Sequence, residues 1–151
     1  MWNPKNYRLG FDPWGLGLFL LIMLPNFIWF ALPAPNDILR TESVTPLIDA
    51  IAQVFQIIMA ALLCAVVNVT RNKSTRRGYQ VGITVCVTCY FSGWVAYYAG
   101  IVNTAVILDL CLAPCGAFLL WAFARRNIPA LISGAAFTVC HFIFAIINFI
   151  F

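Results

Sequence analysis

The segment TAVILDLCLAPCGAFLLWAF, residues 104–123, carries a single charged side chain in 20 positions. An α-helix needs about 20 apolar residues to cross a hydrocarbon core of about 30 Å, so this segment predicts a membrane span. Similar apolar runs lie on both sides of it, at roughly 14–32, 46–69, 79–101 and 128–151. We therefore expect the chain to cross a bilayer five times.

The spans are expected to be helices, because five segments cannot close a β-barrel and every backbone amide in lipid needs an internal partner. The chain is 63% hydrophobic and 9% charged, and its polar connectors are about a dozen residues long at most. This composition leaves no room for a soluble domain. The prediction is a single all-α membrane domain, residues 1–151, whose first partner is the lipid bilayer.

The basic residues predict an orientation. Assigning the connectors alternately to two faces places eight Lys and Arg residues on one face and only Arg40 on the other. Lys and Arg are retained in the cytoplasm, so the N-terminus is expected inside and the C-terminus outside, in a plasma (inner) membrane. The net charge of +4 is typical of such loops and requires no nucleic-acid partner. The eight residues are Lys5, Arg8, Arg71, Lys73, Arg76, Arg77, Arg125 and Arg126.

The first apolar run also has the basic flank of a signal peptide, with Lys5 and Arg8 before it. The run is longer than a typical signal-peptide core, and Pro33 and Pro35 crowd the candidate cleavage point. We therefore expect a retained first span, whereas cleavage would leave four spans.

The polar residues inside the spans are the best guide to function, because such side chains cost free energy in lipid and usually face a bundle interior or a cavity. Counting about 1.5 Å per residue along each helix places them together in the outer half. We expect an amphipathic ligand pocket at this depth, covered by the connector 33–45 as a lid. The candidate ligand-binding residues are Asn26, Gln53, Trp94, Tyr97, Tyr98, Asn103, Asp109, His141 and Asn148.

Each candidate also has a purely structural interpretation. Asp109 can pair with a neighbouring helix, His141 can be a neutral hydrogen-bonded ring, and the asparagines can join helices. The aromatic residues can form an interfacial belt. A different functional alternative is a small transporter or channel subunit in which Asp109 and His141 bind a cation or relay protons.

Catalytic chemistry is not indicated. Cys86 and Cys89 form a C-x-x-C pair suited to a quinone-linked thiol oxidoreductase, but such an enzyme would also need a second, outer pair that the chain lacks. One histidine and one buried aspartate are too few for a metal site. The sequence therefore predicts no catalytic residue, no metal and no required cofactor.

The second half of the chain carries a family resemblance. The run Trp94-Val-Ala-Tyr97-Tyr98-Ala-Gly100, followed by Ala105 and Asp109, precedes a short basic turn at 123–131 and a Phe144-Ala145-Ile-Ile-Asn148 ending. Over residues 94–148 the chain resembles the translocator protein, or tryptophan-rich sensory protein, family. It departs from the family where Thr45-Pro46 replaces a Trp-Thr-Pro-Pro motif and where Thr138-Val-Cys-His141 replaces a Pro-Tyr motif.

The resemblance implies a homodimeric five-helix bundle whose pocket accepts porphyrins, sterols or other hydrophobic ligands. Aromatic residues would stack on a flat ligand, and polar residues would meet its carboxylates or hydroxyls. Our leading hypothesis is a membrane protein that binds such a molecule as a sensor, carrier or chaperone. The residues that the resemblance places in the pocket are Trp94, Tyr98, Asp109, His141 and Asn148.

Overall fold

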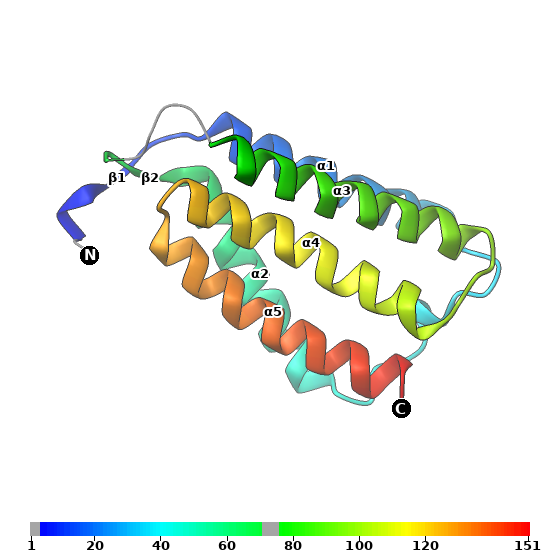
Figure 1. Cartoon of the computed structure of the whole chain (residues 1–151). Helices are drawn as coiled ribbons and strands as arrows, with labels where there is room; N and C mark the ends of the chain where they lie inside the picture. Colours follow the sequence, from blue (N-terminus) through cyan, green and yellow to red (C-terminus); the bar gives the residue numbers. More distant parts are fainter. Residues whose placement is uncertain (1–3, 71–75) are drawn as a thin grey trace.

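Five long helices make up nearly all of the structure, a computed structural model that describes residues 4–70 and 76–151 (Figure 1). Each is long and apolar enough to cross a membrane, which confirms the predicted all-α bundle of five spans. Two of the basic residues used for the orientation, Arg71 and Lys73, lie outside the described residues. The helices are α1 (Pro13–Ala31), α2 (Pro46–Ala65), α3 (Arg77–Tyr98), α4 (Thr104–Ala124) and α5 (Ile128–Phe149).

Helix α4 occupies the centre of the bundle. It packs against α3 on one side and α5 on the other, while α2 packs along α5 and α1 lies beside α3 (Figure 1). The most apolar 18-residue window of α4 is 44% buried, against 17–28% in the other four helices. The two termini lie at opposite ends of the bundle, as an odd number of crossings requires (Figure 1). Which end faces the cytoplasm stays a prediction.

Helix boundaries follow local signals in the sequence. The Asp12 carboxylate caps α1 by accepting hydrogen bonds from the backbone N–H groups of Trp14 (3.2 Å) and Gly15 (3.4 Å), and Pro13 occupies the first helical position. Pro46 begins α2 in the same way. The side chain of Asn103 caps α4 by accepting from the backbone N–H of Val106 at 3.0 Å.

A short two-stranded sheet was not predicted. The sequence prediction continued the second helix to residue 69, but α2 ends at Ala65 and Val66–Asn68 form strand β2. This strand pairs antiparallel with β1 (Tyr7–Leu9). The Asn127 side-chain amide donates to the carbonyl oxygens of Leu62 (2.8 Å) and Val66 (3.0 Å), so it holds the end of α2 against the turn before α5.

Arg125, in the turn between α4 and α5, is buried. It is one of the residues counted for the orientation, and it is only 7% exposed. Its Nε lies 3.2 Å from Oδ2 of Asp12, and its guanidinium lies 4.5 Å from the centre of the Trp121 ring. Buried charges in proteins are usually paired with an opposite charge. Here the pair joins the start of α1 to the end of α4.

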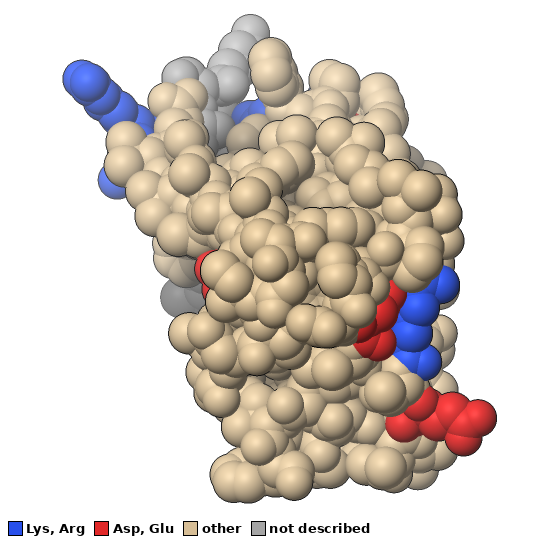
Figure 2. All heavy atoms as spheres, turned by 90° about the vertical axis from the view of Figure 1, so that its right-hand side faces the viewer, with Lys and Arg blue, Asp and Glu red and all other residues tan. Residues whose placement is uncertain are grey.

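Connector 32–45, which includes the short 3₁₀ helix η2 (Ile38–Arg40), joins α1 to α2 at the opposite end of the bundle. Figure 2 views the molecule from this end, and most of the visible surface is uncharged, with acidic and basic atoms side by side at one edge. We call the part of the bundle next to this connector the connector half. It contains the candidate site.

Candidate ligand-binding cavity

A cavity of about 600 Å³ lies between the helices in the connector half. All five helices contribute to its wall, through residues 22–30 of α1, 49–57 of α2, 90 and 94 of α3, 107–118 of α4 and 137–149 of α5. Leu39 of the connector also lines it. A cavity of this size is in the range of small-molecule sites, and its wall is mostly apolar with a few polar groups, as in such sites.

Exposed side chains of α1 and α2 form part of the cavity wall. These two helices touch at their other ends, where a Cβ added to Gly15 would lie 2.8 Å from the Leu63 carbonyl oxygen. In the connector half, both helices line the cavity with exposed side chains, including Phe30 on α1 (66% exposed) and Ile57 on α2 (69% exposed). Both helices are long and apolar enough to cross a membrane.

Four of the nine predicted residues line this cavity: Asn26, Gln53, Trp94 and His141. The Asn26 amide donates to the Tyr90 hydroxyl at 2.6 Å and to its own helix at the Ile22 carbonyl, 3.2 Å away. This bond joins α1 to α3 across one wall. Tyr90 also lines the cavity and was not among the predicted residues.

Trp94 is the centre of an aromatic cluster. Its ring lies 5.7–6.4 Å, between centroids, from the rings of Trp29, Tyr90, Tyr97 and Tyr98. The residue is 6% exposed, and its indole N–H makes no well-formed hydrogen bond among the described residues, although the Tyr90 hydroxyl is a nearby acceptor. Buried polar groups in proteins are nearly always hydrogen-bonded, so this donor on the cavity wall can still bond to an acceptor on a ligand.

His141 lies on the opposite wall, on α5. Its ring stacks on Phe137, with centroids 5.0 Å apart, and more distantly on Phe144 at 6.3 Å. The facing helix α2 lines the cavity with Asp49, Gln53 and Gln56. The histidine thus belongs to the polar part of the wall, and its stacked neighbours fix the plane of its ring.

The remaining five predicted residues do not line the cavity, and they make contacts within and between structural elements instead. Tyr98 donates to the Leu32 carbonyl at 2.7 Å, and Asn103 caps α4. The Asn148 amide nitrogen donates to the Thr45 hydroxyl, and its oxygen accepts from the Val44 N–H, both at 2.7 Å. These contacts attach the connector to α3 and α5.

Asp109 lies on the seam between α3 and α4. A Cβ added to Gly93 would overlap the Asp109 carboxylate, so the two helices approach closely here because residue 93 is a glycine. Asp109 is absent from the cavity wall that His141 lines. The cation or proton alternative needed both residues in one path, and this cavity does not bring them together.

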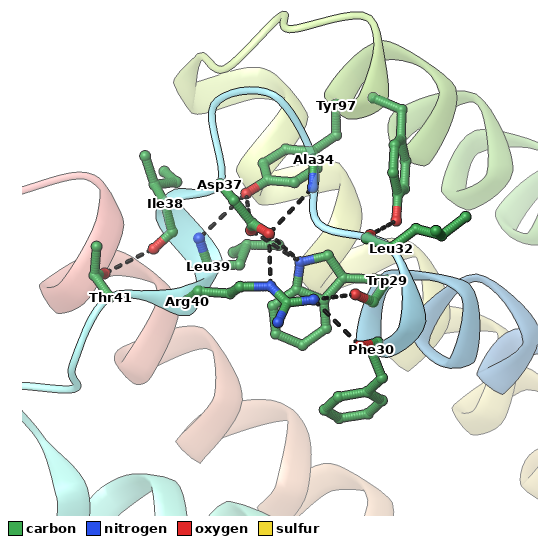
Figure 3. Close-up of polar contacts among 11 residues, drawn as sticks. Trp29, Phe30, Leu32, Ala34, Asp37, Ile38, Leu39, Arg40, Thr41 and Tyr97 are labelled. Atoms are coloured by element: carbon green, nitrogen blue, oxygen red, sulfur yellow. Dashed lines mark hydrogen bonds and ion pairs between the residues drawn. The ribbon is translucent and has the colours of Figure 1, made fainter.

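The connector is a bonded cap centred on Asp37 (Figure 3). The Asp37 carboxylate accepts from the Trp29 indole N–H (2.8 and 3.0 Å), the Tyr97 hydroxyl (2.9 Å), the Ala34 N–H (3.2 Å) and Arg40 Nε (2.8 Å). Burial raises the pKa of Asp37, but these hydrogen bonds outweigh burial and hold the pKa below its ordinary value of 3.8. The sequence did not indicate that α1 and α3 both reach this carboxylate.

Arg40 completes the cap. Its guanidinium donates to the carbonyl oxygens of Trp29 and Phe30 and lies 4.8 Å from the centre of the Trp29 ring. Trp29 and Phe30 both line the cavity, so the cap and the cavity wall share residues (Figure 3). The last turn of α1 contains no basic residue. Arg40 of the connector therefore supplies the positive charge that interacts favourably with the carbonyl end of this helix.

All six cysteines lie within residues 4–70 and 76–151. Cys86 and Cys89 are free thiols, as are the other four cysteines. The described residues include no cluster of three or more His, Cys, Asp or Glu side chains that could hold a metal ion.

Comparison with known proteins gives no family assignment: no family model, no curated protein and no solved structure matches this chain. The structure itself is a five-helix membrane protein with a tryptophan-rich aromatic cluster. These coarse features agree with the resemblance drawn from residues 94–148, which stays a resemblance.

Proposed function

We propose that this membrane protein binds a hydrophobic or amphipathic small molecule in the cavity of its connector half, as a sensor, carrier or chaperone for that molecule. The ligand would enter sideways from the bilayer, between α1 and α2. A porphyrin- or sterol-like ligand, a homodimer and a plasma (inner) membrane location are parts of this proposal that rest on the sequence alone.

The observation that carries the proposal is a cavity of about 600 Å³ whose wall includes the indole N–H of Trp94, a nine-tenths buried donor with no well-formed hydrogen bond among the described residues. A buried donor that lacks a hydrogen bond costs about 1–3 kcal/mol. A bound molecule with an apolar body and a hydrogen-bond acceptor would remove that cost and also fill the apolar space. A sensor, carrier or chaperone needs binding only, so no catalytic group is required.

The test is binding to the protein in lipid nanodiscs. Protoporphyrin and a sterol are titrated separately while tryptophan emission is recorded, since Trp29 and Trp94 both line the cavity. Saturable quenching by either compound is expected. Ala145→Phe should abolish it, because Ala145 is 4% exposed and lines the cavity, so the larger ring would occupy the ligand's space.

The matched control is Ala135→Phe, which places the same ring on an exposed position of α5 outside the cavity wall. This variant should bind like the original protein. Quenching that does not saturate, or that survives Ala145→Phe unchanged, would overturn the proposed function.

A further inference from the structure

The cavity wall carries a negative charge and no permanent positive charge among the described residues. Asp49 lines the cavity, and no Lys or Arg among the described residues does so. The other polar groups on the wall are neutral amides, a tyrosine hydroxyl, two indoles, a thiol and the single histidine, which lies close enough to Asp49 to interact with it. A ligand that carries a carboxylate would therefore meet a like charge with no cation to offset it.

Arg40, the basic residue of the connector, already has hydrogen-bond partners. Arg40 contacts the cavity wall through the Trp29 ring and the backbone oxygens of Trp29 and Phe30, and its Nε lies 2.8 Å from the Asp37 carboxylate. Recruiting Arg40 for an anionic ligand would leave the partly buried Asp37 without its cation. The cap therefore supplies no free positive charge to the cavity.

The position of Asp49 also fits a particular kind of ligand. It lies in the first turn of α2, about 4.5 Å along the helix axis from Pro46, and is therefore close to the membrane surface. Amphipathic molecules dissolved in a bilayer keep their charged group at this depth and their apolar body below it. The apolar and aromatic part of the cavity extends below Asp49, down to Phe118 on α4 and Phe137 on α5.

We propose that the cavity selects amphipathic amines: molecules with a bulky hydrophobic body and a protonated amino group that pairs with Asp49. This inference rests on the proposed function and narrows its ligand class, because it disfavours protoporphyrin, which carries two carboxylates, relative to a neutral sterol or an amine. The amine would donate to the carboxylate, with the side-chain oxygen of Gln53 as a second acceptor on the same helix. Aromatic rings on the wall favour a cation further, because their faces attract positive charge.

The experiment uses three probes with one hydrocarbon body: pyrenemethylamine, pyrenemethanol and pyrenecarboxylate. Each is titrated into protein-containing phosphatidylcholine nanodiscs near pH 7, and saturable energy transfer from tryptophan to pyrene is recorded. Partition into protein-free nanodiscs is measured for each probe, so that affinities are compared at equal concentration in the bilayer. The variants are Asp49→Asn, Asp49→Glu and the control Glu42→Gln, which removes an exposed acidic charge from the connector.

The amine is expected to bind roughly tenfold or more tightly than the alcohol, as for a hydrogen bond to a charged group, and the carboxylate most weakly. Asp49→Asn should bring the amine to the affinity of the alcohol without changing alcohol binding, which also reports that the variant is folded. Asp49→Glu and Glu42→Gln should keep the preference. Equal binding of amine and alcohol, or a preference that survives Asp49→Asn, would overturn this inference and leave the proposed function standing. No saturable transfer with any probe would count against both.

Discussion

The indole N–H of Trp29 contacts both carboxylate oxygens of Asp37, at 2.8 and 3.0 Å. Trp29 lines the cavity and Asp37 organises the connector above it. The same carboxylate accepts a hydrogen bond from Tyr97 of α3. One side chain of the connector thus joins two helices, so the cap and the aromatic wall of the cavity should respond together to changes at Asp37.

Replacing Asp37 by Asn should destabilise the protein by about 2–3 kcal/mol, because the substitution removes the charge that accepts several hydrogen bonds and pairs with Arg40. Equilibrium unfolding in mixed detergent micelles would measure the change. Glu42→Gln, at an exposed position of the same connector, should have an effect within about 0.5 kcal/mol. Equal stabilities for the two variants would show that the Asp37 bonds contribute little.

The cap should also loosen in acid. The pKa of Asp37 is lower in the folded protein than its ordinary value of 3.8, so the carboxylate stabilises the fold above that pH. This contribution declines as the pH falls below the ordinary value and is lost once it passes the lower pKa of the folded state. Amide hydrogen exchange over residues 34–41, compared at about pH 6 and pH 3 after correction for intrinsic rates, should show lost protection at the lower pH. In Asp37→Asn the difference between the two pH values should shrink.

The number of spans and the depth of the polar residues could be predicted from the sequence, because both depend only on position along an apolar run. Which way a side chain faces could not. Helix α4 is apolar around its whole circumference, so nothing in its pattern indicated that Asp109 faces Gly93 while Cys111 and Leu110 face the cavity. The rotation of such a helix is set by packing against its neighbours.

The contacts made by the connectors could not be predicted from the sequence either. Asp12 and Arg125 are separated by more than a hundred residues and meet only because the start of α1 and the end of α4 lie at the same level. Asp37 lies in the connector, and only the arrangement of α1 and α3 makes it an acceptor for Trp29 and Tyr97. Four of the nine predicted residues line the cavity, and the other five make structural contacts away from its wall.

The ion pair between Asp12 and Arg125 should be a major source of stability at the other end of the bundle. Breaking a buried pair by removing one partner typically costs about 3–5 kcal/mol. Arg125→Met should cost this much in unfolding experiments, because it leaves the carboxylate of the 2%-exposed Asp12 without the guanidinium. Arg125→Lys should restore only part, since Lys lacks the planar group that stacks on Trp121. A change below about 1 kcal/mol for Arg125→Met would contradict this role.

Gly93 and Asp109 offer a test of the α3–α4 seam by a double-mutant cycle. Gly93→Ala should destabilise the protein by about 1–3 kcal/mol, because the new methyl group would overlap the Asp109 carboxylate and push the helices apart. In an Asp109→Ala background the same substitution should cost much less, since the overlapping atoms are gone. A matched control is Gly17→Ala in α1, where the added Cβ meets nothing within 4 Å and higher helix propensity should stabilise the helix by up to about 1 kcal/mol. Equal costs of Gly93→Ala in both backgrounds would mean that the carboxylate does not limit the approach of the two helices.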